Sequence, residues 1–204
     1  MIRIFESKQV GRILTRRAAR LTEAEETVRP ILEAVRTRGD QALIEYGRRF
    51  DGLERSTLAI SAAECAAARG RLSPAFRRAV KQASVNIRAF AALQLPAAKS
   101  ATIAPGLKLG QIVRPLDTVA AYIPAGRYPL PSTLMMTVIP AQVAGVPNVC
   151  VATPRPVDEI LGTAAMLKAS RVFQMGGAQA IAAFAYGTQT VPKADRIVGP
   201  GNIY

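Results

Sequence analysis

Short apolar runs alternate with helical patterns through the second half of the chain. Four runs read as strands, at residues 119–123, 149–152, 171–174 and 196–198, and each ends in a turn containing Gly or Pro. Helical patterns fill the intervals near residues 132–144, 157–168 and 179–186. Strands that alternate with helices in this way favour a parallel sheet with crossover helices. The sequence therefore predicts an α/β fold for this half.

The first half is helical. A helix is predicted from Glu25 to Gly39, where Pro30 is tolerable only if the helix begins close to it. Its apolar positions follow the i, i+3, i+4, i+7 pattern: Val28, Ile31, Leu32 and Val35. Asp40 is expected to cap a second helix over residues 41–50. Residues 1–20 show no convincing period and are left as an amino-terminal arm.

Residues 58–113 contain two clear helix starts. Ser61 and Glu64 have the spacing of a capping box, and Ser73-Pro74 supplies a cap and a first-turn proline. The helix after Ser73 carries an apolar stripe that is expected to be core: Phe76, Val80, Ala83, Ile87 and Phe90. Residues 95–110 then read as a connection, with an alternating strand at 107–113. Because the composition changes here, we expect three parts: an arm (1–20), a helical part (21–113) and a strand-helix domain (114–204).

The charge distribution argues against nucleic acid as a partner. The chain of 204 residues has a formal net charge of +13, and residues 61–114 hold nine Lys or Arg against one acid. Six of these cations are spread over two helices, without the aromatic interleaving or the motifs of nucleic-acid-binding domains: Arg69, Arg71, Arg77, Arg78, Lys81 and Arg88. A solvated helix face, or a surface for an acidic partner, explains them better. The chain also lacks a charge-free apolar run of membrane-spanning length and a signal-peptide core at its amino end, so we expect a cytoplasmic protein without membrane contact.

The absence of histidine restricts the chemistry most. It removes the usual neutral-pH proton shuttle and the commonest metal ligand. Cys65 and Cys150 have no metal-site spacing and are expected to be reduced core residues. Asp158 and Glu159 could be a general acid/base pair, but neighbouring helix residues point apart, so a structural role at the start of a helix is favoured.

Polar side chains follow three of the predicted strands. Tyr122 ends the first strand, Gln179 follows the glycine pair after the third, and Asn202 lies in the Gly-Pro-Gly-Asn turn after the fourth. Carboxyl ends of parallel strands meet at one edge, so these residues form a candidate ligand site. The alternative is that Tyr122 is a core aromatic and that Gln179 and Asn202 are a helix-start and a turn residue.

Several motifs in order resemble those of histidinol dehydrogenase. They are Tyr-Ile-Pro-Ala-Gly at 122–126, Gly-Gly-Ala-Gln-Ala-Ile-Ala-Ala at 176–183, Val-Pro-Lys-Ala-Asp-Arg-Ile at 191–197 and Gly-Pro-Gly-Asn at 199–202. Upstream, Arg-Gly-Asp-Gln-Ala-Leu at 38–43 with Tyr46 and Phe50-Asp51 is similar to the amino-terminal helices of that family. The resemblance extends over nearly the whole chain from about Thr27.

The resemblance implies an NAD-dependent, zinc-assisted homodimer that oxidises L-histidinol to L-histidine in two steps, at the end of histidine biosynthesis. It implies a Rossmann-like NAD-binding domain, preceded by a helical segment of an incomplete first domain. Motif by motif, the residues that contact NAD in the family fall on Tyr122, Gln179 and Asn202.

The zinc ligands of the family, and its Glu-His pair for acid/base work, lie beyond the equivalent of Tyr204. We therefore expect this chain to carry the NAD half-site with no catalytic and no metal-binding residue, and to be inactive alone. A non-catalytic dinucleotide-binding or assembly module is the alternative. Since one sheet face and the first domain would be incomplete, exposed apolar surface and self-association are expected.

Overall fold

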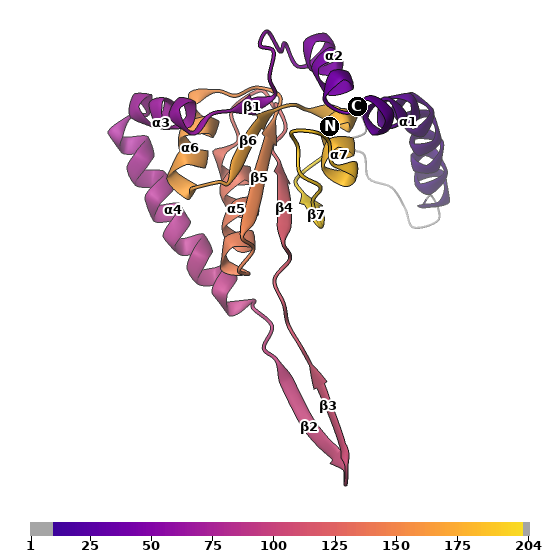
Figure 1. Cartoon of the computed structure of the whole chain (residues 1–204), viewed down its shortest axis with the longest axis vertical. Helices are drawn as coiled ribbons and strands as arrows, with labels where there is room; N and C mark the ends of the chain where they lie inside the picture. Colours follow the sequence, from indigo (N-terminus) through magenta and orange to yellow (C-terminus); the bar gives the residue numbers. More distant parts are fainter. Residues whose placement is uncertain (1–9, 202–204) are drawn as a thin grey trace.

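The computed structural model of the chain describes residues 10–201, with side chains from residue 24 onwards (Figure 1). The helices are α1 (Val10–Arg38), α2 (Asp40–Phe50), α3 (Ala62–Arg71), α4 (Pro74–Leu93), α5 (Pro131–Val143), α6 (Asp158–Leu167) and α7 (Gly177–Tyr186). The strands are β1 (Ala59–Ile60), β2 (Lys99–Ala104), β3 (Leu107–Gln111), β4 (Thr118–Tyr122), β5 (Asn148–Thr153), β6 (Arg171–Gln174) and β7 (Arg196–Val198).

The central sheet has the order β1-β6-β5-β4-β7. Strands β4, β5, β6 and β7 are parallel, whereas β1 pairs antiparallel with β6 at one edge. The predicted α/β fold with a parallel sheet and crossover helices is thus confirmed. From β4 the chain builds outward to β5 and β6 and then returns to place β7 on the opposite side of β4. That reversal of direction lies between β4 and β7, where open α/β sheets form their ligand crevices.

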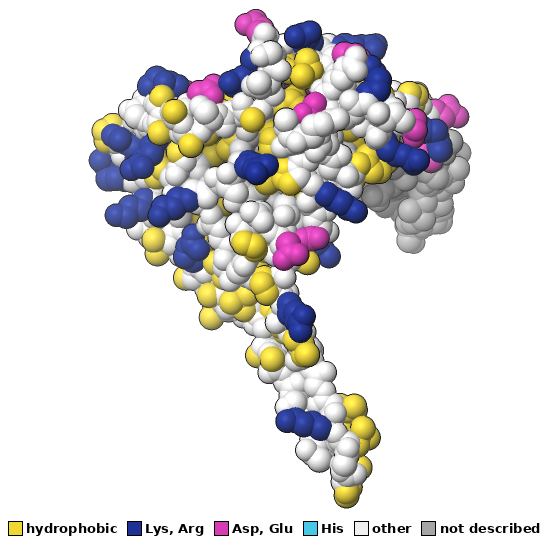
Figure 2. Space-filling view, viewed as in Figure 1, with side chains coloured by type: hydrophobic (Ala, Val, Ile, Leu, Met, Phe, Trp, Pro, Cys, Tyr) yellow, Lys and Arg dark blue, Asp and Glu magenta, His cyan; other side chains and the backbone are white. Residues whose placement is uncertain are grey.

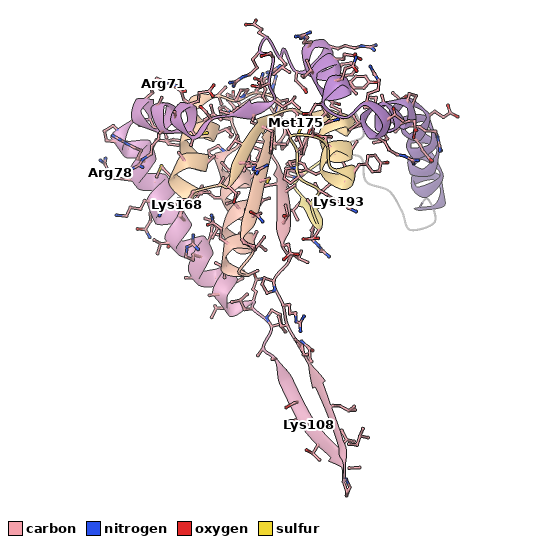
Figure 3. All side chains as sticks on the ribbon, viewed as in Figure 1. Arg71, Arg78, Lys108, Lys168, Met175 and Lys193 are labelled. Carbon is pink, nitrogen blue, oxygen red and sulfur yellow. The ribbon has the colours of Figure 1, made fainter. Side chains whose placement is uncertain are left out.

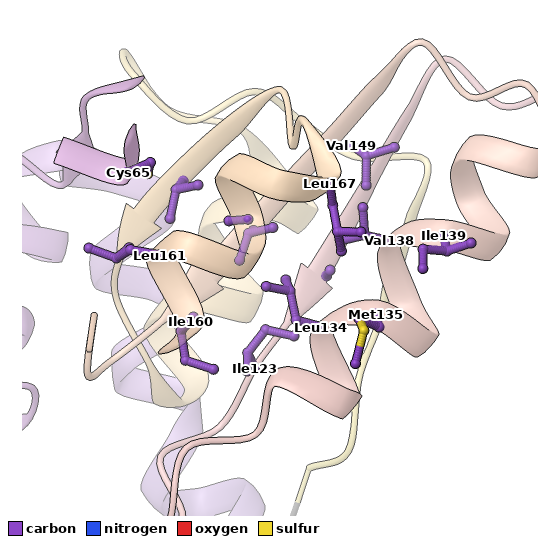
Figure 4. Close-up of a cluster of buried hydrophobic side chains, with 14 of the residues drawn as sticks. Cys65, Ile123, Leu134, Met135, Val138, Ile139, Val149, Ile160, Leu161 and Leu167 are labelled. Carbon is purple, nitrogen blue, oxygen red and sulfur yellow. The ribbon is translucent and has the colours of Figure 1, made fainter. Parts of the chain in front are cut away.

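Helices cover both faces of the sheet, which explains why its strands are apolar throughout. Alternate residues of a strand point to opposite faces. Val119 and Ala121 of β4 belong to the core beneath α3, α4, α5 and α6, whereas Ala120 belongs to the core beneath α1, α2 and α7. β5 divides in the same way, with Val149 and Val151 on the first face (Figure 4). A strand buried on both sides reads as a continuous apolar run instead of an alternating one.

The cap signals are confirmed at two helices. The Ser61 hydroxyl accepts from the Glu64 N–H at 3.2 Å, while the Glu64 carboxylate accepts from the Ser61 N–H at 2.8 Å. Ser73 caps α4 by accepting from the Phe76 N–H at 3.2 Å. Each side chain satisfies an N–H group that the first turn of a helix leaves unpaired.

Two expectations about the first helices were wrong. Helix α1 begins at Val10, well before Glu25, so Pro30 lies inside it. Local preference is a weak guide for a helix that packs, as α1 does, against α2 and α7. Asp40 is the first residue of α2 and not its cap: Gly39 holds that position, with φ of 55°. The Asp40 carboxylate instead accepts from the Thr188 hydroxyl.

One expected core residue, Phe90, is exposed, and Met136 is a second large apolar residue at the surface. Val80 of α4 is buried, but Phe90, further along the same stripe, is 64% exposed. Helix α4 packs against α5, and in Figure 1 its end runs past the end of α5, so α5 does not cover the last part of the stripe. In α5, Met135 is buried whereas Met136 is 66% exposed, because consecutive helix residues point about 100° apart.

The expected division at residues 113 and 114 separates segments that share one core. Strand β1 and helices α3 and α4, from the first half, pack in the same cluster as β4 and β5, with Ile60, Cys65 and Val80 among the buried residues. A shared core does not test where domains begin and end, so the three-part division of the chain stays a prediction.

Strands β2 and β3 form an antiparallel hairpin that projects away from the sheet (Figure 1). Every residue of both strands is exposed, including Ile103 at 62% and Leu109 at 54%. From here on, the arm means this hairpin, residues 99–111, and not the amino-terminal arm expected at residues 1–20. A two-stranded hairpin buries little surface by itself, so the arm presents apolar side chains to its surroundings.

Basic side chains gather on α3 and α4, on the left of Figure 2. One of them, Arg71, forms a bidentate pair with Asp158 of α6, and Arg88 donates to the Gln142 side chain of α5. These contacts link the basic helices to the helices that cover the sheet. No helix among residues 10–201 is both long and apolar enough to cross a membrane.

Candidate functional site

The carboxyl ends of the parallel strands lie at one edge of the sheet. Tyr122, the last residue of β4, is in register with Ala152 of β5, and Thr153 is in register with Gln174 of β6. β6 passes directly into α7 through Met175 and Gly176, and Figure 3 labels Met175 at this point. Tyr122 and the start of α7 are thereby brought to the same edge.

The turn between β6 and α7 brings a backbone N–H within hydrogen-bond distance of the Tyr122 hydroxyl. Gly177 has φ of 55°, a conformation that glycine adopts at little cost. Its N–H donates to the Tyr122 hydroxyl oxygen at 3.2 Å. Gly176 lies in a confined position, where a Cβ would be 2.7 Å from Pro154 Cβ and 2.8 Å from Asp51 Oδ1. The glycine pair therefore allows close contact between this turn and its neighbours.

Gln179 lies in the first turn of α7, and its side chain is fixed by Asp51. It is 2% exposed, and its Nε2 donates to Asp51 Oδ2 at 3.0 Å. The same carboxylate oxygen accepts from the Gly176 N–H at 2.8 Å. Burial raises the pKa of Asp51, while the hydrogen bonds from Gly176 and Gln179 act in the opposite direction. Asp51 therefore ties the end of α2 to the start of α7.

Sequence reasoning did not select Asp51 as a site residue. It was noted only as part of the Phe50-Asp51 pair that resembles the family, because it comes just after a helix with no visible chemistry. Its role depends on a contact between residues 128 positions apart. Neither periodicity nor cap patterns carry information about such a contact.

The third predicted residue, Asn202, lies outside the described residues. The turn before it approaches β4 closely: a Cβ added at Gly199 would be 2.2 Å from the Tyr122 carbonyl oxygen. Residue 199 therefore has to be glycine for β7 to end beside β4 with this backbone, where φ is 151°. Of the three predicted residues, the structure brings Tyr122 and Gln179 together around Gly177.

This arrangement suits the binding of a polar ligand that carries phosphate. At the amino end of α7 the Gly176 and Gly177 N–H groups are bonded to Asp51 and Tyr122, which leaves the N–H groups of Ala178 and Gln179, and N–H groups in the first turn of a helix attract anions. Beside it, the Tyr122 hydroxyl and the Gln179 amide can each form hydrogen bonds. The glycine turn after β6, which contacts Tyr122 at the end of β4, lets a ligand approach the backbone closely. These features fit a dinucleotide.

The residues do not fit zinc. Among the side chains that the structure describes, those of residues 24–201, there is no group of three or more His, Cys, Asp or Glu that could hold a metal ion. Asp158 is paired with Arg71, and this hydrogen bond lowers the pKa of the Asp158 carboxyl. Its structural role is thus confirmed. Cys65 and Cys150 are free and buried, as expected, and burial raises the pKa of each thiol.

Comparisons with known proteins agree on one family. The family model of histidinol dehydrogenase matches residues 14–204. A histidinol dehydrogenase of Methanosarcina barkeri is 46% identical over 197 residues, which cover 94% of this chain and 46% of that protein. One from Methanothermobacter thermautotrophicus is 40% identical over 205 residues, covering 98% of this chain and 48% of the relative.

A solved structure gives the same result. The crystal structure of histidinol dehydrogenase from Elizabethkingia anophelis superposes with a TM-score of 0.82 at 34% identity, covering 87% of this chain and 42% of that one. The chain thus spans about half the length of the relatives it matches. With the fold, the motifs and these similarities in agreement, the chain belongs to the histidinol dehydrogenase family.

Proposed function

We propose that this chain supplies the NAD half-site of a histidinol dehydrogenase. The complete enzyme would oxidise L-histidinol to L-histidine in two steps in histidine biosynthesis, with zinc held by residues outside the described part of this chain. The observation that carries the proposal is the Tyr122–Gly177–Gln179 cluster at the reversal point of the sheet, in a chain of this family. As expectations that accompany it, the enzyme would be a cytoplasmic homo-oligomer.

The residues of this chain bind and orient, and they leave the proton transfers to other groups. When bound, NAD would accept the hydride that each oxidation step releases. The phosphates would be held by the N–H groups of the first turn of α7 that Asp51 and Tyr122 do not occupy, those of Ala178 and Gln179. Tyr122 offers a ring for packing and a hydroxyl for a hydrogen bond. Gln179, which is almost fully buried, offers its side-chain amide. Asn202 would add a second amide, as the resemblance implies.

Two measurements test the proposal. Calorimetric titration of the 204-residue chain with NAD should show saturable binding, and an assay of the same chain with L-histidinol, NAD and zinc should show no NADH formation. Zinc-dependent oxidation by this chain alone would contradict the placement of the catalytic groups elsewhere. Absence of any NAD binding would contradict the half-site.

The second candidate is a non-catalytic dinucleotide-binding or assembly module. It is favoured by the absence, among the side chains of residues 24–201, of a cluster that could hold a metal. Mixing the chain with a separately expressed carboxyl-terminal half of the Methanosarcina barkeri relative distinguishes the two. Recovery of NADH formation supports the half-enzyme, whereas NAD binding without recovery supports the module.

A further inference from the structure

Asp51 is a partly buried acid for which the proposed function gives no task. It follows α2, far in sequence from the β6–α7 turn, yet one of its oxygens accepts two hydrogen bonds from that turn. Burying a carboxylate is unfavourable unless hydrogen bonds compensate. The two donors, Gly176 and Gln179, belong to the segment that would contact the cofactor. The position of Asp51 therefore calls for an explanation beyond its place at the end of a helix.

The carboxylate determines which way the Gln179 amide faces. An ionised carboxylate can only accept hydrogen bonds, so the Nε2 group of Gln179 must be the end directed at Asp51. Oε1 then points the other way, over Gly177, where a Cβ would be 2.8 Å from this oxygen. Within residues 24–201 Oε1 has no hydrogen-bond donor, and it is not one of the fully buried unpaired side-chain atoms, so it keeps some exposed surface although Gln179 as a whole is only 2% exposed. A free acceptor thus lies at Gly177, the residue whose N–H binds the Tyr122 hydroxyl.

The hydroxyl of Tyr122 is oriented by the same turn. Because the Gly177 N–H donates to its oxygen, the remaining hydroxyl hydrogen is directed away from Gly177. The site accordingly presents one acceptor, Gln179 Oε1, and one hydroxyl that can donate. A ligand group that both donates and accepts, as a ribose hydroxyl does, matches this pair.

We propose that Asp51 is a positioning residue: it holds the Gln179 amide so that Oε1 accepts a hydrogen bond from a hydroxyl of the bound dinucleotide. The inference rests on the proposed NAD half-site and adds to it the direction of one hydrogen bond and the residue that sets it. Asp51 acts through Gln179 and does not touch the ligand itself.

A double-mutant cycle with the 204-residue chain and NAD tests this role. Asp51→Ala should weaken NAD binding by roughly tenfold, since it frees the amide to rotate and leaves a buried donor unpaired. Gln179→Ala should weaken it by a similar factor. If Asp51 acts through Gln179, adding Asp51→Ala to Gln179→Ala should change the affinity no further. If the loss of affinity in the double variant equals the product of the losses in the two single variants, the residues act independently and the proposal is overturned.

Asp40 supplies the matched control. It is the first residue of α2, and it joins that helix to the segment that follows α7, through the Thr188 hydroxyl and the Thr190 N–H. Asp40→Ala should therefore lower stability without changing NAD affinity. An equal loss of affinity in Asp40→Ala and Asp51→Ala would show that Asp51 only holds α2 in place, and would overturn its positioning role.

Two further measurements keep the proposal testable if Asp51→Ala does not fold. Asp51→Asn retains an oxygen that can accept both bonds and should keep most of the affinity, whereas Gln179→Glu removes the donor and should lose it. In nuclear magnetic resonance spectra, the Nε2 protons of Gln179 should exchange slowly in the wild type and in Asp51→Asn. Fast exchange in the wild type would overturn the geometry without reference to any ligand. Failure of the wild type to bind NAD would instead overturn the proposed function, and with it the ligand assigned here.

Discussion

At the scale of single residues, the candidate site depends on glycine. Gly177 adopts φ of 55°, and a Cβ there would be 2.8 Å from Gln179 Oε1. A side chain at this position would meet two costs: the left-handed backbone conformation and contact with the amide that faces the ligand. Glycine is required here for both local and site geometry.

Gly177→Ala should lower the free energy of unfolding by about 1 kcal/mol or more and also weaken NAD binding. Gly52→Ala is the matched control, because Gly52 has φ of 63° but no atom within 4 Å of an added Cβ. Gly52→Ala should lower the free energy of unfolding only by the cost of the positive φ, and it should keep its NAD affinity. Urea unfolding and calorimetric titration measure the two effects. Equal losses in both variants would show that the contact with Gln179 has no consequence.

Gln179→Ala and Asn202→Ala, made in a complete enzyme, should weaken NAD binding by roughly 1 to 3 kcal/mol each, the range for leaving a buried polar partner unpaired. Zinc affinity should stay unchanged, since neither residue is expected to be a ligand to the metal. Equilibrium titrations with NAD and with zinc check both statements. A change in zinc affinity alone would contradict this assignment of roles.

At the scale of elements, the start of α3 is held by one small network. Ser61 and Glu64 form the capping box, and Arg55 pairs with the Glu64 carboxylate at 2.9 Å. The hydrogen bond from Arg55, followed by those from Ser61, lowers the pKa of Glu64 to about 2. α3 in turn packs against α6, so its first turn supports one wall of the core.

Ser61→Ala should cost about 1 kcal/mol of stability, the usual cost of losing such a cap, and Ser73→Ala should cost a similar amount at α4. The two caps differ in one respect: the cap of α3 includes an acid, Glu64, which titrates at low pH, whereas the cap of α4 does not. Because the folded-state pKa of Glu64 is depressed, its contribution is fully present above the unfolded value of 4.5 and is lost as the pH falls through about 2.

The stability difference between the wild type and Glu64→Gln should therefore shrink as the pH falls from 4.5 and vanish near pH 2. The difference between the wild type and Ser73→Ala should change much less over this range, because Ser73 accepts from Phe76 without an acid partner. Urea unfolding over a pH series provides the comparison. A constant difference for Glu64→Gln would contradict the lowered pKa.

At the scale of the whole molecule, exposed apolar surface lies on the arm and the nearby end of α4. The strongest exposed positions include Phe90, Leu93, Ile103 and Ile112. Both faces of the sheet are covered by helices, so the uncovered sheet face expected from the sequence is not the main source of exposure. Figure 2 shows hydrophobic side chains at the tip of the arm, away from the sheet.

The 204-residue chain should therefore self-associate, and a charge on the apolar face of the arm should reduce this. Leu109 is in register with Ala101, whereas Ser100 is in register with Gly110 on the opposite face. Leu109→Lys should shift the chain toward monomer in sedimentation velocity, while Ser100→Lys adds the same charge and should not. A wild-type chain that stays monomeric at high concentration would contradict the expectation.

The sequence alone determined the order and type of most elements. Repeated apolar runs and helical patterns located β4, β5, β6 and β7, and the short-range patterns at Ser61 and Ser73 located two helix starts. These signals are readable because they depend on residues within a few positions of one another. The family could be recognised for a related reason, since its motifs are contiguous stretches at the ends of strands.

Tertiary structure alone decided what lies next to what. Helix α1 continues through Pro30, β1 pairs antiparallel at the edge of the sheet, and Phe90 is exposed where α4 passes beyond α5. Tertiary structure also joined Asp51 to Gln179, so a residue without any local signal became the support of the candidate site. Such contacts depend on packing between distant segments, and a pattern confined to one segment does not encode its neighbours in space.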